Sequence, residues 1–225
     1  MIGQEKFYLL GSGWISAFGN GFFGSRPQFS NSDVRFQYPE LEKYIPELPG
    51  RFGRFDVYTK ICFAAAVLAL KDADMLEGAR DKEKKSIGII LGSSSGVYDD
   101  DLAFFESTRE SKGEFSSPNL FSYTLPNVAL GEITVFFKFS GPTFCVGNDH
   151  QRSGITGIPA ALSLLVSKQC ECVLVGWVEA SQNISHHEKF PKGAAFAVLS
   201  MEMTGKSKGV FSFNQEFNFS ELFEG

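Results

Sequence analysis

The sequence lacks several features that would assign a function directly. Its four cysteines form no CxxC motif with a second Cys/His pair, so no zinc site is expected. No run of about 18 apolar residues is present, which argues against a transmembrane helix. The N-terminus has no basic region followed by an apolar stretch, so no signal peptide is expected. The net charge of −5 gives no electrostatic reason to expect nucleic acid or an anionic membrane as a partner.

Two further absences concern cofactors. The segment LGSSSG (91–96) lacks the lysine and spacing of a P-loop and the glycine pattern of a dinucleotide site, so a tight turn is the better interpretation. The adjacent His186 and His187, followed by Glu188, do not share a face, so a metal site would need distant ligands and an exposed loop is favoured. We therefore expect neither a cofactor nor a metal ion.

The residues that are present describe a globular protein with a large apolar content. The chain has 225 residues, of which 43% are hydrophobic and 24 are phenylalanine, so a substantial core or interface is expected. Cys62 lies in an alanine-rich run and Cys172 opens another apolar run. Both are expected to be reduced core residues, which favours a cytoplasmic location. No repeat or linker interrupts the sequence, so 1–225 is interpreted as a single domain.

Strand-like and helix-like segments alternate along the chain. Asp56 is a plausible N-cap for a helix over 57–76, in which apolar residues recur at helical spacing. The run Asp99–Asp101 is typical of the first turn of a helix, where carboxylates complement the helix dipole. A second helix is expected over 153–168, little regular structure over 19–55, and a loop over 111–119. Strands are expected over 5–10, 86–92, 143–146, 171–180, 193–202 and 209–217.

This alternation predicts an α/β fold, and the late strands without a helix between them suggest an antiparallel addition. The segment 126–139 stays ambiguous on pattern alone. Asn127 could cap a helix there, but the β-branched and aromatic residues favour a strand.

The segment GPTFCVGNDHQRSG (141–154) has the pattern of a strand, a turn and the start of a helix. Free N–H groups and the positive dipole end of a helix at such a corner lower the pKa of a thiol and can hold an oxyanion. An enzyme would place Cys or Ser there, whereas this sequence offers His150 and Gln151. Glutamine has no nucleophile, but its amide can fill a pocket and donate hydrogen bonds.

Several segments, in order, resemble the N-terminal half of a β-ketoacyl synthase, a thiolase-like fold. They are RFGRFDVYTKICFAAAVLALKDADM, SIGIILGSSSG, FSYTLPNVALGEITVFFKFSGP, CVLVGWVEA and GAAFAVLSMEMTGKSKG. The resemblance covers nearly the whole chain. It implies a mixed sheet with helices on both faces, and it favours a helix over 126–139.

The resemblance also implies a nucleophilic cysteine at the corner, and this sequence departs from that pattern. Counting forward from Gly141-Pro142 places His150 at the position, whereas counting back from Glu179 and from Ser153-Gly154 places Gln151 there. We favour Gln151. Pro159 is a second departure, because it would kink a helix that starts near Arg152.

No segment resembles the second half of the family, which carries two histidines, so that half is expected to be absent. A lone half should expose apolar helix faces and therefore needs a partner. We expect a homodimer, or a heterodimer with a ketosynthase, and an acyl carrier protein as a further partner.

The resemblance implies a non-condensing protein like the chain-length factors of fatty-acid or polyketide biosynthesis, which replace the cysteine. No residue is assigned a catalytic role, Gln151 or His150 marks the vestigial nucleophile position, and the sequence favours a protein that is not an enzyme. One alternative is a malonyl-thioester decarboxylase that uses Gln151 and a backbone oxyanion site. The other is a non-catalytic homodimeric binding or scaffold protein that keeps only the fold.

Overall fold

A computed structural model describes residues 5–30, 35–76, 86–110, 113, 116–147, 156–183, 191–212 and 222–223. Its strands are β1 (Phe7–Ile15), β2 (Asn20–Phe22), β3 (Ile87–Ser93), β4 (Thr143–Gly147), β5 (Cys172–Glu179), β6 (Gly193–Ser200) and β7 (Gly209–Phe211). Its α-helices are α1 (Val57–Asp72), α2 (Tyr98–Glu110), α3 (Pro118–Phe121), α4 (Asn127–Phe137) and α5 (Gly157–Val166). Two 3-10 turns, Leu41–Lys43 and Phe52–Arg54, precede α1.

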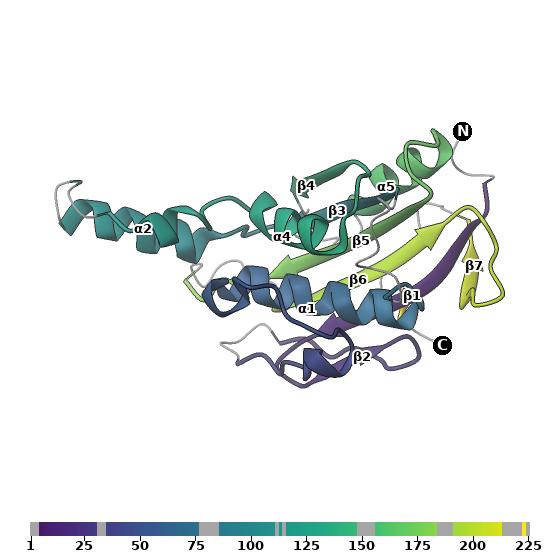
Figure 1. Cartoon of the computed structure of the whole chain (residues 1–225), viewed down its shortest axis with the longest axis horizontal. Coiled ribbons are helices and arrows are strands. Elements are labelled where there is room, and N and C mark those ends of the chain that lie inside the picture. The colour runs from purple at the N-terminus through teal and green to yellow at the C-terminus, as the bar shows by residue number, and fades with distance from the viewer. Residues whose placement is uncertain are drawn as a thin grey trace.

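The strands form one mixed sheet in the order β2-β1-β6-β5-β3-β4, with β7 also paired to β1. Strands β5, β3 and β4 run parallel, whereas β6 is antiparallel to both β5 and β1. Helices α1 and α4 pack on one face of the sheet and α5 packs on the other. The α/β fold, the antiparallel late strand and the two helical layers are therefore confirmed. Helix α2 projects away from the sheet (Figure 1).

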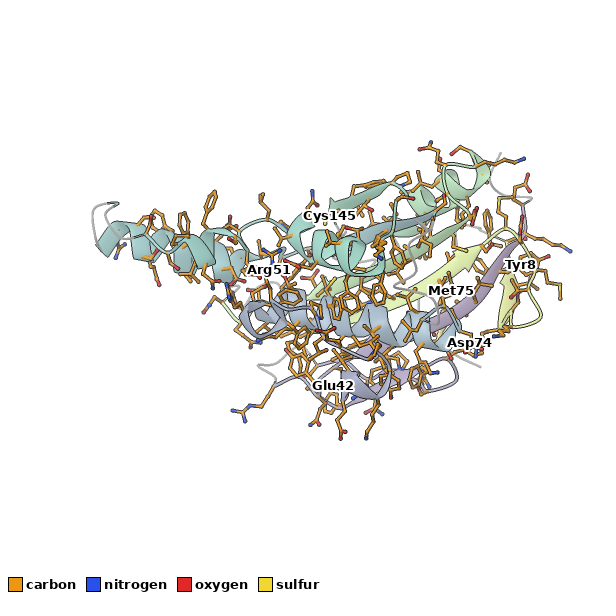
Figure 2. All side chains as sticks on the ribbon, in the orientation of Figure 1. Tyr8, Glu42, Arg51, Asp74, Met75 and Cys145 are labelled. Atoms are coloured by element: carbon orange, nitrogen blue, oxygen red, sulfur yellow. The ribbon has the colours of Figure 1, made fainter. Side chains whose placement is uncertain are left out.

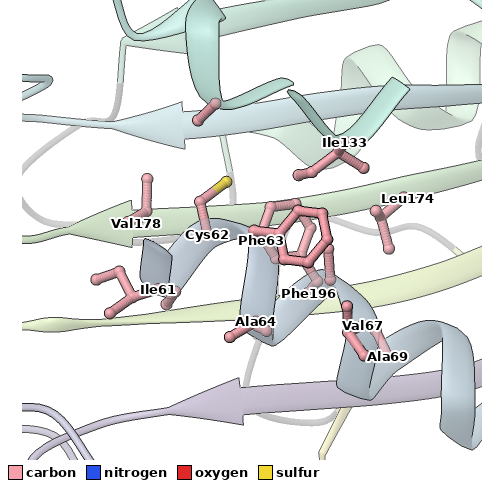
Figure 3. Close-up of a cluster of buried hydrophobic side chains, with 14 of the residues drawn as sticks. Ile61, Cys62, Phe63, Ala64, Val67, Ala69, Ile133, Leu174, Val178 and Phe196 are labelled. Carbon is pink, nitrogen blue, oxygen red and sulfur yellow. The ribbon is translucent and has the colours of Figure 1, made fainter. Parts of the chain in front are cut away.

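Helix α1 forms the centre of one core. The Asp56 carboxylate caps its start by accepting bonds from the N–H groups of Tyr58 and Thr59, at 3.0 and 3.2 Å. Every residue over 61–70 is completely buried, so the helix is apolar on all sides. Figure 3 shows Phe63 of this helix between the strands and Ile133 of α4.

Strand β1 is longer than predicted, because it continues through Gly11 to Ile15. Gly11 and Gly13 do not end the strand but let α1 lie directly on it. A Cβ atom on Gly13 would lie 2.4 Å from the Ala69 nitrogen, and one on Gly11 would lie 2.3 Å from the Ala73 nitrogen.

The ambiguous segment over 126–139 is a helix, as the resemblance implied. One face of α4 buries Ala129, Leu130, Ile133 and Phe137. The ring of Phe63 lies 5.3 Å from that of Phe136 and 6.0 Å from that of Phe137. Tertiary packing of the aromatic residues thus outweighs their strand propensity.

Other predicted bounds differ in detail. The segment 19–55 has little regular structure, as expected, with β2 and the two 3-10 turns as exceptions. Helix α3 begins at Pro118, inside the predicted loop, since Ser117 caps it and proline suits a first helical turn. Strand β7 covers only Gly209–Phe211, and 213–217 lie outside the described residues.

Candidate functional site

The carboxyl ends of the parallel strands β3, β4 and β5 meet at one side of the molecule. The turn at 94–97 follows β3, the corner at 148–156 follows β4, and the segment 180–183 follows β5. Ligands of open α/β sheets bind outside this side of the sheet. We therefore take it as the candidate functional site.

The corner is flanked by a strand and a helix, as predicted, and the residues 148–155 between them lie outside the described part of the chain. Strand β4 ends at Gly147, and helix α5 begins at Gly157 after Thr156. Both candidates for the nucleophile position, His150 and Gln151, lie outside the described residues. The one-residue choice between them therefore stays a prediction.

Pro159 does not kink helix α5. It lies in the first turn of the helix, where a backbone N–H has no partner within the helix. The expected kink presupposed a helix that starts near Arg152, and that residue lies outside the described part of the chain.

The native thiols lie in the sheet and the packed core. Cys145 is within β4, in register with Leu91 of β3 (Figure 2). Burial raises its pKa to about 11. Cys62 is fully buried, as predicted, and burial raises its pKa well above the usual value. Cys172 is only partly buried but packs against the same core, and burial raises its pKa to about 11. These environments disfavour the thiolate that a nucleophile requires.

Glu179, at the end of β5, holds the turn that follows β3. Its carboxylate accepts hydrogen bonds from the N–H of Ser94, and from the N–H and hydroxyl of Ser95 at 3.0 and 2.5 Å. Burial raises the pKa of this carboxyl, and the bonds from the two serines lower it. The segment LGSSSG is thus a tight turn, as predicted, and two of its N–H groups are occupied by a side chain of the protein.

Asp99, at the start of α2, links the same two regions in the opposite sense: it follows β3 and binds the segment after β5. Its carboxylate accepts bonds from the Ser181 hydroxyl at 2.5 Å, the Gln182 N–H at 2.7 Å and the Asn183 N–H at 3.3 Å. The predicted acidic first turn of α2 is therefore confirmed. Asp99 and Glu179 together cross-link the segments that follow β3 and β5.

A groove of about 550 Å³ opens beside this pair of connections. Its walls come from segments far apart in sequence: 35–38, 55–58, 96–100 and 180–182. Three aspartates line it, Asp56, Asp99 and Asp100. Burial raises the pKa of Asp100 to about 7, with further contributions from the charge and hydrogen bond of Asp56.

A sequence model of a protein family matches most of the chain. The model of the β-ketoacyl synthase N-terminal domain matches residues 40–205. This chain belongs to the β-ketoacyl synthase family. A search of curated protein sequences finds no match.

Solved structures of synthases share the fold. A structure described as the ishigamide ketosynthase/chain length factor has a TM-score of 0.62 at 16% identity, covering 87% of this chain and 62% of the other. A β-ketoacyl synthase from Burkholderia phymatum STM815 has a TM-score of 0.60 at 17% identity, covering 88% of this chain and 59% of the other.

A third structure is described as the ketosynthase ApeO in complex with its chain length factor ApeC from Xenorhabdus doucetiae. It has a TM-score of 0.51 at 18% identity and covers 68% of this chain and 61% of the other. The matched part of our synthase-family chain thus spans about six tenths of these relatives. At such identities the likeness shows the fold, the half of a thiolase-like architecture that the sequence predicted.

Sequence reasoning missed two parts of this synthase-family site, the role of Glu179 and the aspartate-lined groove. The partners of Glu179 lie 84 and 85 residues away, and no local pattern links them. The capping role of Asp56 was predictable, but its contact with Asp100 was not.

The described residues contain no group of three His, Cys, Asp or Glu side chains arranged to hold a metal ion. The segment His186–Glu188 lies outside that part of the chain. In the same part, every helix is too short or too polar to cross a membrane.

Proposed function

We propose that the chain is a non-condensing, ketosynthase-like subunit of the chain-length-factor kind, acting in polyketide or fatty-acid assembly beside a competent ketosynthase. One observation carries the proposal. The sequence between β4 and α5, NDHQRSGIT (148–156), contains no cysteine, although the family places its nucleophile there.

The properties of the native thiols support this proposal. Cys145 is the nearest cysteine to the corner, and burial in β4 raises its pKa to about 11. At neutral pH it is therefore almost entirely protonated, and it lies within a strand of the sheet. A replacement nucleophile from elsewhere in the described chain has no support.

A partner is part of the proposal, and the edge of the sheet supports one contact. Strand β4 is an edge strand in the described sheet, so one side of its backbone is open for pairing. The exposed face of helix α5 gives less support for a partner contact, because an apolar helix face was expected. Its exposed positions include Pro159, Ser163 and Val166, which form a mixed surface and not an apolar one.

The experiment uses carrier protein loaded with an acyl group and carrier protein loaded with malonyl. Incubated with both, the purified chain is expected to give no condensation product. Added to a competent ketosynthase, it is expected to change the length distribution of the products. Gln151→Ala and His150→Ala serve as matched variants, since only the residue that contacts the acyl chain should shift that distribution.

Two results would count against the proposal. Condensation by the purified chain alone would show that it is a complete enzyme. Release of carbon dioxide from malonyl carrier protein, abolished by Gln151→Ala, would favour the decarboxylase instead.

A further inference from the structure

Helix α2 stands apart from the sheet in the described part of the chain. Asp99 fixes its start to the segment after β5, and its body packs against α3, where the rings of Phe104 and Phe121 lie 5.3 Å apart. The helix then projects away from the sheet (Figure 1). A helix of 13 residues is marginal in water on its own, so a partly apolar outer face favours a further contact.

One stripe of exposed side chains runs along the outer face of α2. Its members recur at spacings of three, four and four residues, which places them on one side of a helix: Tyr98, Asp101, Phe105 and Arg109. Tyr98 is 45% exposed and Phe105 is 56% exposed. Phe121 of the adjacent α3 is 62% exposed and adds to the apolar surface. The stripe therefore combines large apolar side chains with one acidic and one basic residue.

The two charges of the stripe lie at equal distances on either side of Phe105. Asp101 precedes it by four residues and Arg109 follows it by four, so each is displaced by about 6 Å along the helix axis. The ion pairs among the described residues include neither side chain. A second α2 that runs in the opposite direction, with Phe105 on a two-fold axis, would bring each Asp101 opposite an Arg109 of the other copy.

We propose that α2 pairs with the α2 of a second copy of this chain, antiparallel and centred on Phe105. The two Phe105 rings meet at the axis, and an ion pair between Asp101 and Arg109 closes the contact on each side. The charges favour this occupant, because the stripe matches itself in the antiparallel direction, whereas a parallel pair would bring like charges together. The inference depends neither on the proposed synthase-like function nor on the edge of β4.

The contact is expected to be weak. A helix of 13 residues is about 20 Å long, so the pair buries less than the roughly 1,200 Å² of a standard stable interface. We therefore expect a dissociation constant on the order of 100 µM for the full chain. Sedimentation equilibrium over a concentration series that spans this value measures it.

Cysteine cross-linking of the full chain tests the register of the pair. In the proposed contact the two residues 105 are adjacent, whereas the two residues 98 lie about 21 Å apart along the axis. Phe105→Cys should therefore give a disulfide-linked dimer on mild oxidation at about 200 µM, and the matched variant Tyr98→Cys should not. The unsubstituted chain measures the background from the native thiols.

Charge reversal tests the ion pairs. Asp101→Arg and Arg109→Asp should each weaken association by about ten-fold, because each replaces two attractive pairs by two repulsive ones. The double variant Asp101→Arg/Arg109→Asp restores opposite charges and should recover most of the loss. Glu106→Gln, exposed on α2 but outside the stripe, is the control and should change association by less than about two-fold. Circular dichroism checks the helix content, and cross-linking decides where a variant loses helix.

The outcomes separate this contact from other partners. Self-association with more cross-linking at 105 than at 98, and recovery in the double variant, support it. Equal cross-linking at both positions, no recovery in a double variant that keeps its helix content, or a chain that stays monomeric throughout the series overturns it.

The same holds for two alternative contacts. A dimer that is lost in Thr143→Lys and unchanged in Phe105→Ser would place self-association at β4. A chain that is monomeric alone, but whose pairing with a ketosynthase is weakened by Phe105→Ser, would assign α2 to that partner. Both results overturn the self-contact and leave the proposed synthase-like role intact. Failure to change the product lengths of a ketosynthase would count against that role and leave this contact standing.

Discussion

Single side chains hold together the segments that follow the strands at this site. Glu179, at the end of β5, is the clearest example, because it binds the turn after β3. A buried carboxylate is costly unless donors surround it. Here three donors from the turn after β3 surround it. The carboxylate therefore serves as a structural ligand of the turn.

Replacing Glu179 by alanine should destabilise the fold by about 3 kcal/mol, because the part-buried N–H groups of Ser94 and Ser95 lose a charged acceptor. Glu179→Gln should cost about half as much, since one amide oxygen remains. Urea unfolding measures both. Glu171→Ala, at an exposed position just before β5, is the control and should change stability by less than about 0.5 kcal/mol. Equal losses in the two alanine variants would contradict this role.

Asp100 makes stability depend on pH. Its pKa is raised to about 7 in the folded protein, against 3.8 for the free side chain. Its charged form is therefore penalised above pH 7, and the penalty is relieved as pH falls from 7 toward 4. From this group alone, the unfolding equilibrium constant should fall by up to about ten-fold per pH unit over that range.

The variant Asp100→Asn isolates this effect. It should be more stable than the wild type at pH 8, and the difference should shrink as pH falls to 5. Urea midpoints at four pH values give the curve, with Glu106→Gln, at an exposed position further along α2, as control. Parallel curves for Asp100→Asn and the wild type would show that Asp100 titrates normally.

At the scale of elements, the contact between α1 and β1 depends on missing side chains. A Cβ atom on Gly13 would lie 2.4 Å from the Ala69 nitrogen and 2.5 Å from the Leu68 Cβ atom. Neither atom is the end of a flexible chain, so helix and strand would have to separate. Close packing of this kind tolerates no added methyl group.

Gly13→Ala should therefore cost about 3 kcal/mol or more in the free energy of unfolding. Gly131 of α4 is the matched case, because a Cβ atom there meets nothing within 4 Å. Gly131→Ala should stabilise the fold by about 0.5–1 kcal/mol, through higher helix propensity. Chemical denaturation measures the free energy of unfolding of both variants. A change of the same sign in Gly13→Ala and Gly131→Ala would contradict this explanation.

The corner between β4 and α5 can be tested with a new thiol. The family resemblance implies free N–H groups at the start of a helix beside the nucleophile position, and such surroundings would lower the pKa of a cysteine placed there. Gln151→Cys should therefore react with iodoacetamide at pH 7 faster than the native thiols, whose pKa values are raised. His150→Cys is the matched variant, and the faster of the two identifies the position. Reaction no faster than that of free cysteine in both would argue against a helix-activated corner.

Sequence alone located most elements because their signals are local. The N-cap Asp56, the acidic first turn of α2 and the buried run of β5 each follow from neighbouring residues. The predicted strand ended too early, at Gly11, for a different reason. Gly11 is a glycine because the end of α1 packs directly on it, and this contact joins residues 62 positions apart in sequence. The segment over 126–139 needed a family resemblance, because its aromatic residues suit a strand until Phe63 packs against them.

At the scale of the whole molecule, the two edges of the described sheet differ. One edge is β4, with five residues and a parallel neighbour. The other side of β1 is covered by β2 and β7, each of three residues. Short strands such as these are a common protection against pairing with other chains.

A lysine on the β4 edge should therefore weaken pairing. We expect Thr143→Lys to reduce association of the chain with itself or with a cognate ketosynthase, measured by light scattering over a concentration series. Val210→Lys is the control, because this exposed residue lies in β7 at the opposite edge. Equal effects of the two substitutions would place the contact elsewhere.

The candidate site was predictable in position but not in detail. The sequence predicted the corner itself, whereas its place beside the turn after β3 follows from the observed parallel order of β5, β3 and β4. The groove was not, since it needs 35–38 beside 96–100, and the segment 35–38 has no periodicity that fixes its path.

The unequal edges of the sheet also limit how many copies can assemble. A β4 strand that pairs with another β4 forms a two-fold contact, in which each copy uses up the same surface. Counting the strands of the described residues, such a pair would have only the short β2 and β7 at its outer borders. Growth by sheet extension would thus stop at two chains, which protects a protein with 24 phenylalanines from forming fibres.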